Sequence, residues 1–161
     1  MLDSGKPYYW QFVEPHWDRV NIYGTANDFL ADYKRLSKPV QHLLTCTWCH
    51  SEVCNGGFHQ FFGNSTGVLA PEAAIGFEAI GLPKAAVAVS GAMHFFGKRF
   101  PRAQPVREQR LNEYAAANPE AWNPFEAFDE HFYDALGTGA YADDWEKVAD
   151  AYTRRALGSQ P

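Results

Sequence analysis

The residues best suited to chemistry lie together in the segment Cys46-Thr47-Trp48-Cys49-His50. Two cysteines separated by two residues and followed by a histidine have the spacing at which c-type haem is covalently attached. That attachment belongs to exported proteins, and the stretch from Met1 to Tyr9 has neither the basic nor the apolar region of a secretion signal. We therefore expect no haem and no other cofactor.

Metal binding is the second chemistry that this segment could perform, because thiolates and imidazoles are ligands that suit zinc. The candidate ligands are Cys46, Cys49, His50 and Cys54, with His42 and His59 nearby. Structural zinc sites usually draw ligand pairs from two separate segments, and this sequence offers one such segment. We therefore predict no metal site and expect buried thiols that line a helix interface.

Nucleophilic catalysis would need a cysteine thiolate beside a histidine base. A turn at Gly56 and Gly57 could bring Cys54 and His59 together, although nothing in the sequence requires it. The chain has no phosphate-binding loop, nucleophile elbow or zinc-protease motif. The sequence therefore favours a protein without catalytic residues.

The most distinctive stretch runs from Glu52 to Gly67 and contains two adjacent glycines that permit a sharp reversal of the backbone. We expect a corner between two helices here, anchored by phenylalanines, and call it the Asn-Gly-Gly-Phe corner. Its residues are Asn55, Gly56, Gly57, Phe58, Gln60 and Asn64. The functional alternative is a small enzyme or ligand-binding protein that uses a polar pocket on this corner, built from Asn55, His59, Gln60 and Asn64.

Proline, glycine and capping residues mark the helices that must position this corner. Thr25 and Asp28 resemble a capping box that begins a helix over 26–36. Asp143 and Glu146 show the same pattern at the start of a last helix that ends before Gly158. Other helices are predicted to begin at prolines and to end at a glycine or before the next proline, over approximately 39–55, 71–81, 83–97, 105–118 and 124–137.

These patterns predict an all-α fold, a single compact domain of six or seven helices joined by short Pro/Gly turns. Only the stretch Tyr8 to Tyr23 could be a strand, and its alternation is poor. We expect an N-terminal aromatic-rich segment, 1–24, packed on an all-helical domain over 25–158. The 161 residues are about one domain's worth of chain, and 16% aromatic residues imply a core built largely from rings.

The charge is unevenly distributed along the chain. The net charge is −5, but residues 84–110 hold six bases and one acid, whereas residues 119–161 hold nine acids and three bases. One interpretation is ordinary solvated helix faces with acids at helix N-termini. The other is an acidic C-terminal surface that meets a basic partner. Its residues would be Asp129, Glu130, Asp134, Asp143, Asp144, Glu146 and Asp150.

The corner also carries a resemblance to a known family. The pattern Glu-Val-x-Asn-Gly-Gly-Phe-x-Gln-Phe-Phe-x-Asn-Ser-x-Gly, with Leu36-Ser37-Lys38-Pro39 before it and Ala79-Ile80-Gly81 after it, resembles a bacterial family first catalogued as a domain of unknown function and now named after DNA-mimic proteins. The resemblance continues through Pro105 with Arg110 and through residues 128–133, and covers roughly residues 28–157. It implies an all-helical domain, homodimers, and no known cofactor or catalytic residue. It also implies a function, because characterised members of the family carry an acidic surface that occupies the DNA-binding face of a helix-turn-helix repressor.

The net charge limits how much of a DNA duplex this protein could imitate. A compact domain of this length has a radius of gyration of roughly 15 Å and would cover about 40 Å of duplex, which carries on the order of 23 phosphate charges. The net charge of −5 is far smaller. We predict a cytoplasmic, non-enzymatic interaction protein, a homodimer by resemblance, that binds a basic protein such as a transcription regulator. The acidic composition and the lack of long apolar runs predict neither direct nucleic-acid binding nor a membrane span.

Overall fold

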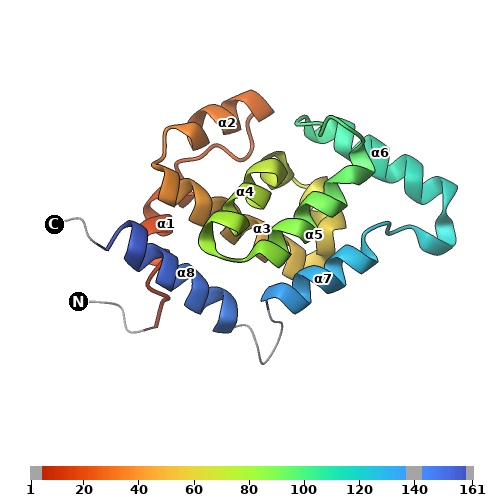
Figure 1. Ribbon diagram of the computed structural model, residues 1–161. Coiled ribbons are helices and arrows are strands. Elements are labelled where there is room, and N and C mark those ends of the chain that lie inside the picture. Colours follow the sequence, from red (N-terminus) through yellow and green to blue (C-terminus); the bar gives the residue numbers. More distant parts are fainter. Residues whose placement is uncertain (1–4, 137–142, 159–161) are drawn as a thin grey trace.

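The computed structural model describes residues 5–136 and 143–158, and within these ranges it contains eight α-helices, three short 3-10 helices and no strand. The predicted all-α fold is confirmed, with one helix more than the predicted six or seven. Figure 1 shows α3 inside the assembly, and α7 and α8 along its lower edge. The α-helices are α1 Trp10–Trp17, α2 Ala26–Lys34, α3 Lys38–Gly63, α4 Ala70–Ile80, α5 Pro83–Met93, α6 Gln104–Ala117, α7 Glu126–Leu136 and α8 Asp143–Ala156; the 3-10 helices are η1 Ser65–Leu69, η2 His94–Phe96 and η3 Pro119–Ala121.

The additional helix is α1, which lies in the stretch where a strand was the open alternative. Trp10, Val13 and Trp17 recur at the spacing of one helical face, and Val13 is fully buried. The Trp17 ring lies 5.0 Å from the ring of Trp48 on α3, centroid to centroid. The possible strand was therefore wrong, because the apolar positions follow a helical period rather than an alternating one.

Helix ends follow the predicted signals closely. Thr25 Oγ1 accepts a hydrogen bond from the Asp28 backbone N–H, and the Asp28 carboxylate accepts one from the Thr25 N–H, so the predicted capping box is present. Gly81 ends α4 with a φ of 100°, a left-handed conformation that favours glycine. The second predicted capping box depends on the side chain of Asp143, which is not among those that the structure describes.

The central helix, α3, has 26 residues and is buried on most sides over its first half. Its close partner is α4, where Gly76 leaves room for the thiol of Cys46. A Cβ at Gly76 would lie only 2.8 Å from Cys46 Sγ. Cys46 therefore sits at a tight helix–helix interface, as the hypothesis of buried thiols expected.

The last helix, α8, joins the N-terminal segment to α3. Asp150 on α8 accepts a hydrogen bond from the Tyr9 backbone N–H at 2.7 Å. On the α3 side, the His50 ring stacks on Trp145 at a centroid distance of 5.1 Å, and His42 Nδ1 lies 2.7 Å from the Tyr152 hydroxyl. These contacts fix α8 against the core at both of its ends.

Aromatic rings fill the core at the other end of the molecule. Phe62, which is fully buried, lies within 5.8 Å of the Phe96, Phe100 and Phe125 rings, measured between centroids. These residues come from α3, from the region of η2, and from the segment before α7, so one ring holds three parts of the chain together. In the described ranges, no helix combines the length and the apolarity that crossing a bilayer would require.

Candidate functional site

The Asn-Gly-Gly-Phe corner is a kink within α3. The two glycines leave helical geometry, with φ −154° and ψ 25° at Gly56, and φ 70° and ψ −177° at Gly57. A side chain at Gly57 would be strained by its positive φ, and its Cβ would come within 2.7 Å of an Asp129 carboxylate oxygen. The predicted end of the helix at these glycines is therefore a change of direction, after which α3 continues to Gly63.

Asp129 of α7 caps the part of α3 that follows the kink. Its Oδ1 accepts a hydrogen bond from the Phe58 N–H at 2.7 Å, a donor that the kink leaves without an intrahelical partner. Its Oδ2 lies 3.4 Å from the donating Asn123 Nδ2. Burial raises the pKa of Asp129, and the Phe58 hydrogen bond partly opposes that rise. Asp129 is only 8% exposed, so the structure places this predicted surface acid in an internal contact.

Glu52 gathers the polar side chains on the other side of the kink. Its Oε2 accepts hydrogen bonds from Gln60 Nε2 at 2.7 Å and from Asn64 Nδ2 at 2.9 Å. Its Oε1 accepts a hydrogen bond from Thr66 Oγ1 at 3.1 Å. Asn55 donates to Gln60 Oε1 at 3.3 Å. One carboxylate therefore joins residues before the kink to residues after it.

A polar pocket of about 410 Å³ opens beside Glu52. Its lining differs from the predicted set, since Asn64 is the one residue they share. His59 lies elsewhere, with its ring 5.0 Å from that of Trp122, which is 50% exposed. Local spacing does not place Glu52 beside Gln104, because only the kink and the packing of α6 bring them together. The lining residues are Ile22, Tyr23, Gly24, Glu52, Asn64, Ser65, Thr66 and Gln104.

Arg107 of α6 holds the C-terminal end of α3 from inside the protein. Its side chain is fully buried and donates hydrogen bonds to the backbone carbonyls of Phe62 at 2.7 Å and Asn64 at 2.8 Å, and to those of Pro101 and Arg102. Burial lowers its pKa to about 10. The guanidinium thus satisfies carbonyls that a helix end leaves free and complements the negative end of the helix dipole.

Two further bases of segment 84–110 also bind groups of the protein itself. Arg102 forms a bidentate pair with Glu72, at 2.6 and 3.0 Å, and Arg110 donates to the Phe96 carbonyl at 2.5 Å. Arg110 is nevertheless exposed, as are Lys84, Lys98 and Arg99. Half of the bases that form the positive segment in sequence are therefore bound to groups of the protein itself.

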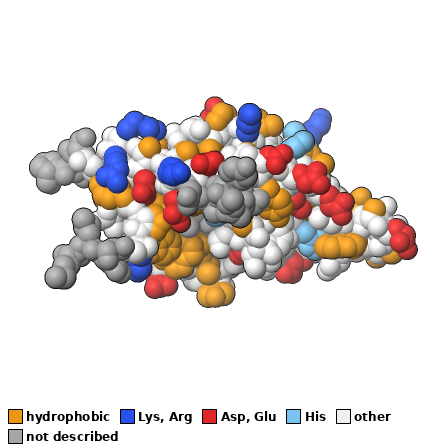
Figure 2. All heavy atoms as spheres, turned by 90° about the horizontal axis from the view of Figure 1, so that it is seen from below, with side chains coloured by type: hydrophobic (Ala, Val, Ile, Leu, Met, Phe, Trp, Pro, Cys, Tyr) orange, Lys and Arg blue, Asp and Glu red, His pale blue; other side chains and the backbone are white. Residues whose placement is uncertain are grey.

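Many of the acids lie in a stretch of the sequence that contains no lysine or arginine. Between Arg110 and Lys147 there are nine acids and no Lys or Arg. On the face that Figure 2 draws, a run of acidic side chains lies over the half away from the chain ends, and further acids lie on the other half. Asp150 is half-buried by its bond to Tyr9, and the side chain of Asp143 lies outside the described residues. The exposed members on α7 and α8 are Glu126, Glu130, Asp134, Asp144 and Glu146.

The cysteines lie in surroundings that disfavour the thiolate. Cys46 and Cys49 are buried as expected, whereas Cys54 is exposed, so the expectation of buried thiols is wrong for that residue. Desolvation raises the pKa of all three thiols. The described residues contain no group of three or more His, Cys, Asp or Glu side chains placed to hold a metal ion. Neither Cys54 nor His59 lines the polar pocket, and burial lowers the pKa of His59. Their arrangement therefore offers no activated nucleophile.

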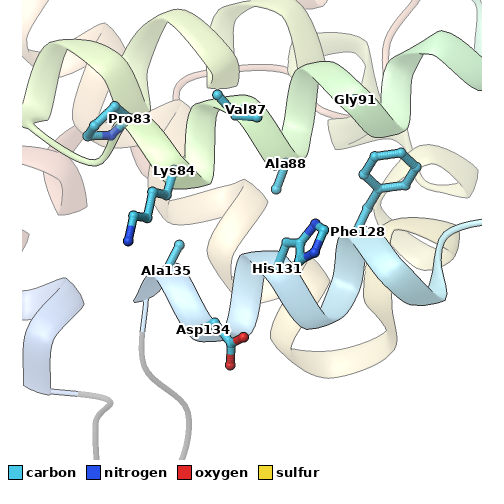
Figure 3. A pocket seen from close by; sticks show the side chains of 9 residues that line it. All are labelled: Pro83, Lys84, Val87, Ala88, Gly91, Phe128, His131, Asp134 and Ala135. Atoms are coloured by element: carbon cyan, nitrogen blue, oxygen red, sulfur yellow. The ribbon is translucent and has the colours of Figure 1, made fainter.

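An apolar hollow of about 660 Å³ lies between α5 and α7 (Figure 3). Phe128 and His131 of α7 line it opposite Ala88 and Gly91 of α5. Val87, which is 71% exposed, lines both this hollow and a neighbouring one of about 700 Å³ next to α4. This surface was not part of the predicted site, because an alanine-rich helix gives no sign of which side stays uncovered.

Comparison with known proteins identifies the family. The comparison with curated proteins and the comparison with solved structures each gave no match. A family model described as DMP19-like protein, named for DNA mimic protein 19, matches residues 34–155. That range contains the kink of α3, the Glu52 contacts, Arg107 and the acidic helix α7. The resemblance noted in the sequence is thereby confirmed, and the chain belongs to the DMP19-like protein family.

Proposed function

We propose that this protein binds a basic, DNA-binding protein through the exposed acids of α7 and α8. The observation that carries the proposal is the stretch from Arg110 to Lys147, which displays acids with no lysine or arginine among them. Glu126, Glu130 and Asp134 follow each other at intervals of four residues and are all exposed. They form one line of charge along α7.

The spacing of these three acids can be compared with the spacing of phosphates along DNA. Four helical residues rise about 6 Å, whereas the phosphates of one DNA strand follow each other every 3.4 Å along the duplex axis. The line on α7 therefore has roughly half the charge density of one strand. It is suited to replacing a few phosphate contacts in a DNA-binding protein, and it does not need the charge of a whole duplex. A net charge of −5 is compatible with that role.

Membership of the DMP19-like family supports the class of partner, because the family takes its name from a DNA mimic. The pairing of Arg102 with Glu72 and the complete burial of Arg107 support the choice of surface. Without these contacts, the two bases would repel a positively charged partner. The function is thus a non-enzymatic interaction in which the partner's DNA-binding face meets α7 and α8.

The test is charge reversal with a matched control. Glu130→Lys changes the net charge by the same amount as Asp18→Lys, and both residues are exposed. Binding to a panel of purified helix-turn-helix repressors is measured with and without their operator duplex. We expect operator DNA to compete with the protein, and the α7 variant to bind at least about tenfold more weakly than the control variant.

Salt provides the second measurement, since surface charge pairs weaken when the Debye length falls from about 10 Å at 0.1 M to about 3 Å at 1 M. The complex should dissociate in high salt. Equal binding of Glu130→Lys and Asp18→Lys, or simultaneous binding of operator and protein to one repressor, would contradict the proposal.

A further inference from the structure

The polar pocket at the kink holds a carboxylate whose charge no cation of the described residues neutralises. Three neutral donors, Gln60, Asn64 and Thr66, bind the Glu52 carboxylate. Within the described ranges, Glu52 takes part in none of the ion pairs. Glu52 nevertheless lines a pocket of about 410 Å³, a size typical of small-ligand sites. The pocket therefore presents a fixed negative charge to whatever enters it.

The remaining lone pairs of Glu52 restrict the shape of a cation that could bind. A carboxylate offers about four acceptor sites, two on each oxygen. Gln60 and Asn64 use both sites of Oε2, and Thr66 uses one site of Oε1. A guanidinium fork needs a free site on each oxygen, whereas an ammonium group can donate a single N–H to Oε1. The geometry therefore favours ammonium over guanidinium.

Two other acceptors could complete the contacts of an ammonium group. Asn64 and Gln104 line the same pocket, and their side-chain amide oxygens accept no hydrogen bond from the described part of the chain. With Glu52 Oε1 they supply three acceptors for the three N–H groups of an ammonium. The remaining wall contains Ile22 and Tyr23, and the Tyr23 side chain is 91% exposed. An apolar stem could lie against these two residues.

We propose that this pocket binds a primary ammonium group on an alkyl stem, with Glu52 as the anchor and the amide oxygens of Asn64 and Gln104 as further acceptors. A lysine side chain of a partner and a free alkylamine share this chemistry. The proposal does not depend on the acidic surface of α7 and α8, because Glu52 lies on α3 and lines a different hollow.

The experiment titrates three probes of similar length, n-butylamine, n-butylguanidine and 1-butanol, into the full chain. Binding is followed by amide chemical shifts at neutral pH, where an alkylamine is protonated. We expect saturable binding of n-butylamine that shifts the amides of residues 22–24 and 64–66. The guanidine and the alcohol should bind at least about tenfold more weakly.

Variants separate the pocket from general attraction to an acidic protein. Glu52→Gln keeps the side-chain size and should weaken n-butylamine binding at least about tenfold, whereas Glu130→Gln on the exposed face of α7 removes the same charge and should leave it unchanged. Because Glu52→Gln could disturb the kink, Tyr23→Ala serves as a second variant that changes an exposed side chain. It should weaken binding about threefold without changing the unfolding temperature.

The source of the ammonium group is distinguished by two further ligands, Nα-acetyl-lysine methylamide and spermidine. Tighter binding of the lysine derivative assigns the pocket to a protein partner, and tighter binding of spermidine assigns it to a free amine; either result supports the ammonium site. The proposal is overturned if Glu52→Gln and Glu130→Gln affect n-butylamine equally, or if the guanidine or the alcohol binds as well as the amine.

Discussion

Gly57 is the residue at which the direction of α3 is decided. Its φ of 70° belongs to the left-handed region, and the Asp129 carboxylate occupies the space where a side chain would start. That carboxylate also accepts the hydrogen bond from the Phe58 N–H. Any other residue at position 57 would therefore be strained in its backbone and would also collide with the Asp129 carboxylate. A single methyl group is enough to disturb both.

Gly57→Ala should therefore lower the free energy of unfolding by about 3 kcal/mol. The matched control is Gly63→Ala at the end of the same helix, where a new Cβ would meet only Leu111 Cδ1 at 3.9 Å. That change should stay within about 1 kcal/mol of the parent. Urea unfolding of both variants gives the measurement. Similar losses for the two alanines would show that the kink does not need glycine.

The glycines of this site are recognisable in the sequence, but the side chains around them are not. The double glycine indicated the corner because adjacent residues without Cβ atoms are a local signal. Asp129 stands 71 positions from Phe58, and Arg107 stands 45 from Phe62, so neither partner could be read from local spacing. Asp129 was counted as a surface acid for the same reason, since a charge in sequence carries no mark of burial.

At the scale of helices, α8 depends on neutral histidines of α3. Burial lowers the pKa of His50 from 6.5 to about 4, and the His50 ring stacks on Trp145 of α8. His42, whose pKa burial also lowers, meets Tyr152 further along the same pair of helices. The folded state therefore favours the uncharged rings. Protonation acts against the docking of α8.

The sign of the resulting pH dependence follows from linkage. The pKa of His50 is about 4 in the folded state and 6.5 in the unfolded state. The neutral ring contributes fully to the free energy of unfolding above pH 6.5. This contribution is lost as the pH falls toward 4, because the unfolded state binds the proton first. Between pH 7 and pH 4.5, the parent should lose about 2 kcal/mol more of its unfolding free energy than His50→Gln does. The exposed His131→Gln should behave like the parent. Equal losses in parent and His50→Gln would contradict this assignment.

Most helix boundaries were predictable because prolines, glycines and capping residues act locally. Pro83 and Gly81 stand at the ends of helices as expected, and the Thr25 capping box is formed. The errors occur where tertiary packing dominates. The segment of α1 takes helical form with Pro15 inside it, and α3 continues beyond its glycines because Asp129 caps the continuation.

For the whole molecule, the arrangement of charge matters more than its total. The chain divides in sequence into a basic middle and an acidic end, and folding binds three of the middle arginines to carbonyls and to Glu72. Glu126, Glu130 and Asp134 of α7 remain exposed, whereas Asp129 of the same helix is buried. A line of three exposed acids on α7 therefore stands in a chain whose composition is only mildly acidic.

Self-association stays a prediction, and α5 shows where to test it. Val87 is 71% exposed and Ile75 62% exposed, and hollows lie on both sides of Val87. We expect a homodimer that buries this face, so Val87→Glu should raise the dimer dissociation constant at least about tenfold. Val106→Glu, the same change at a valine of α6 that is 39% exposed, is the control. Sedimentation equilibrium measures both, and a monomeric parent or equal effects of the two changes would contradict the expectation.

The contact between Trp122 and His59 gives the molecule an optical probe of its own. Trp122 is half exposed, whereas Trp48 and Trp145 are 4% and 2% exposed, so a collisional quencher such as acrylamide reaches Trp122 in preference to these two indoles. Trp122 lies in the stretch that separates α6 from the acidic helix α7, and its indole rests against a ring from the kink of α3. Trp10 and Trp17 are partly exposed as well, so the quenching that is lost in Trp122→Phe isolates this side chain. That signal can report, without any added label, when a partner covers that end of the protein.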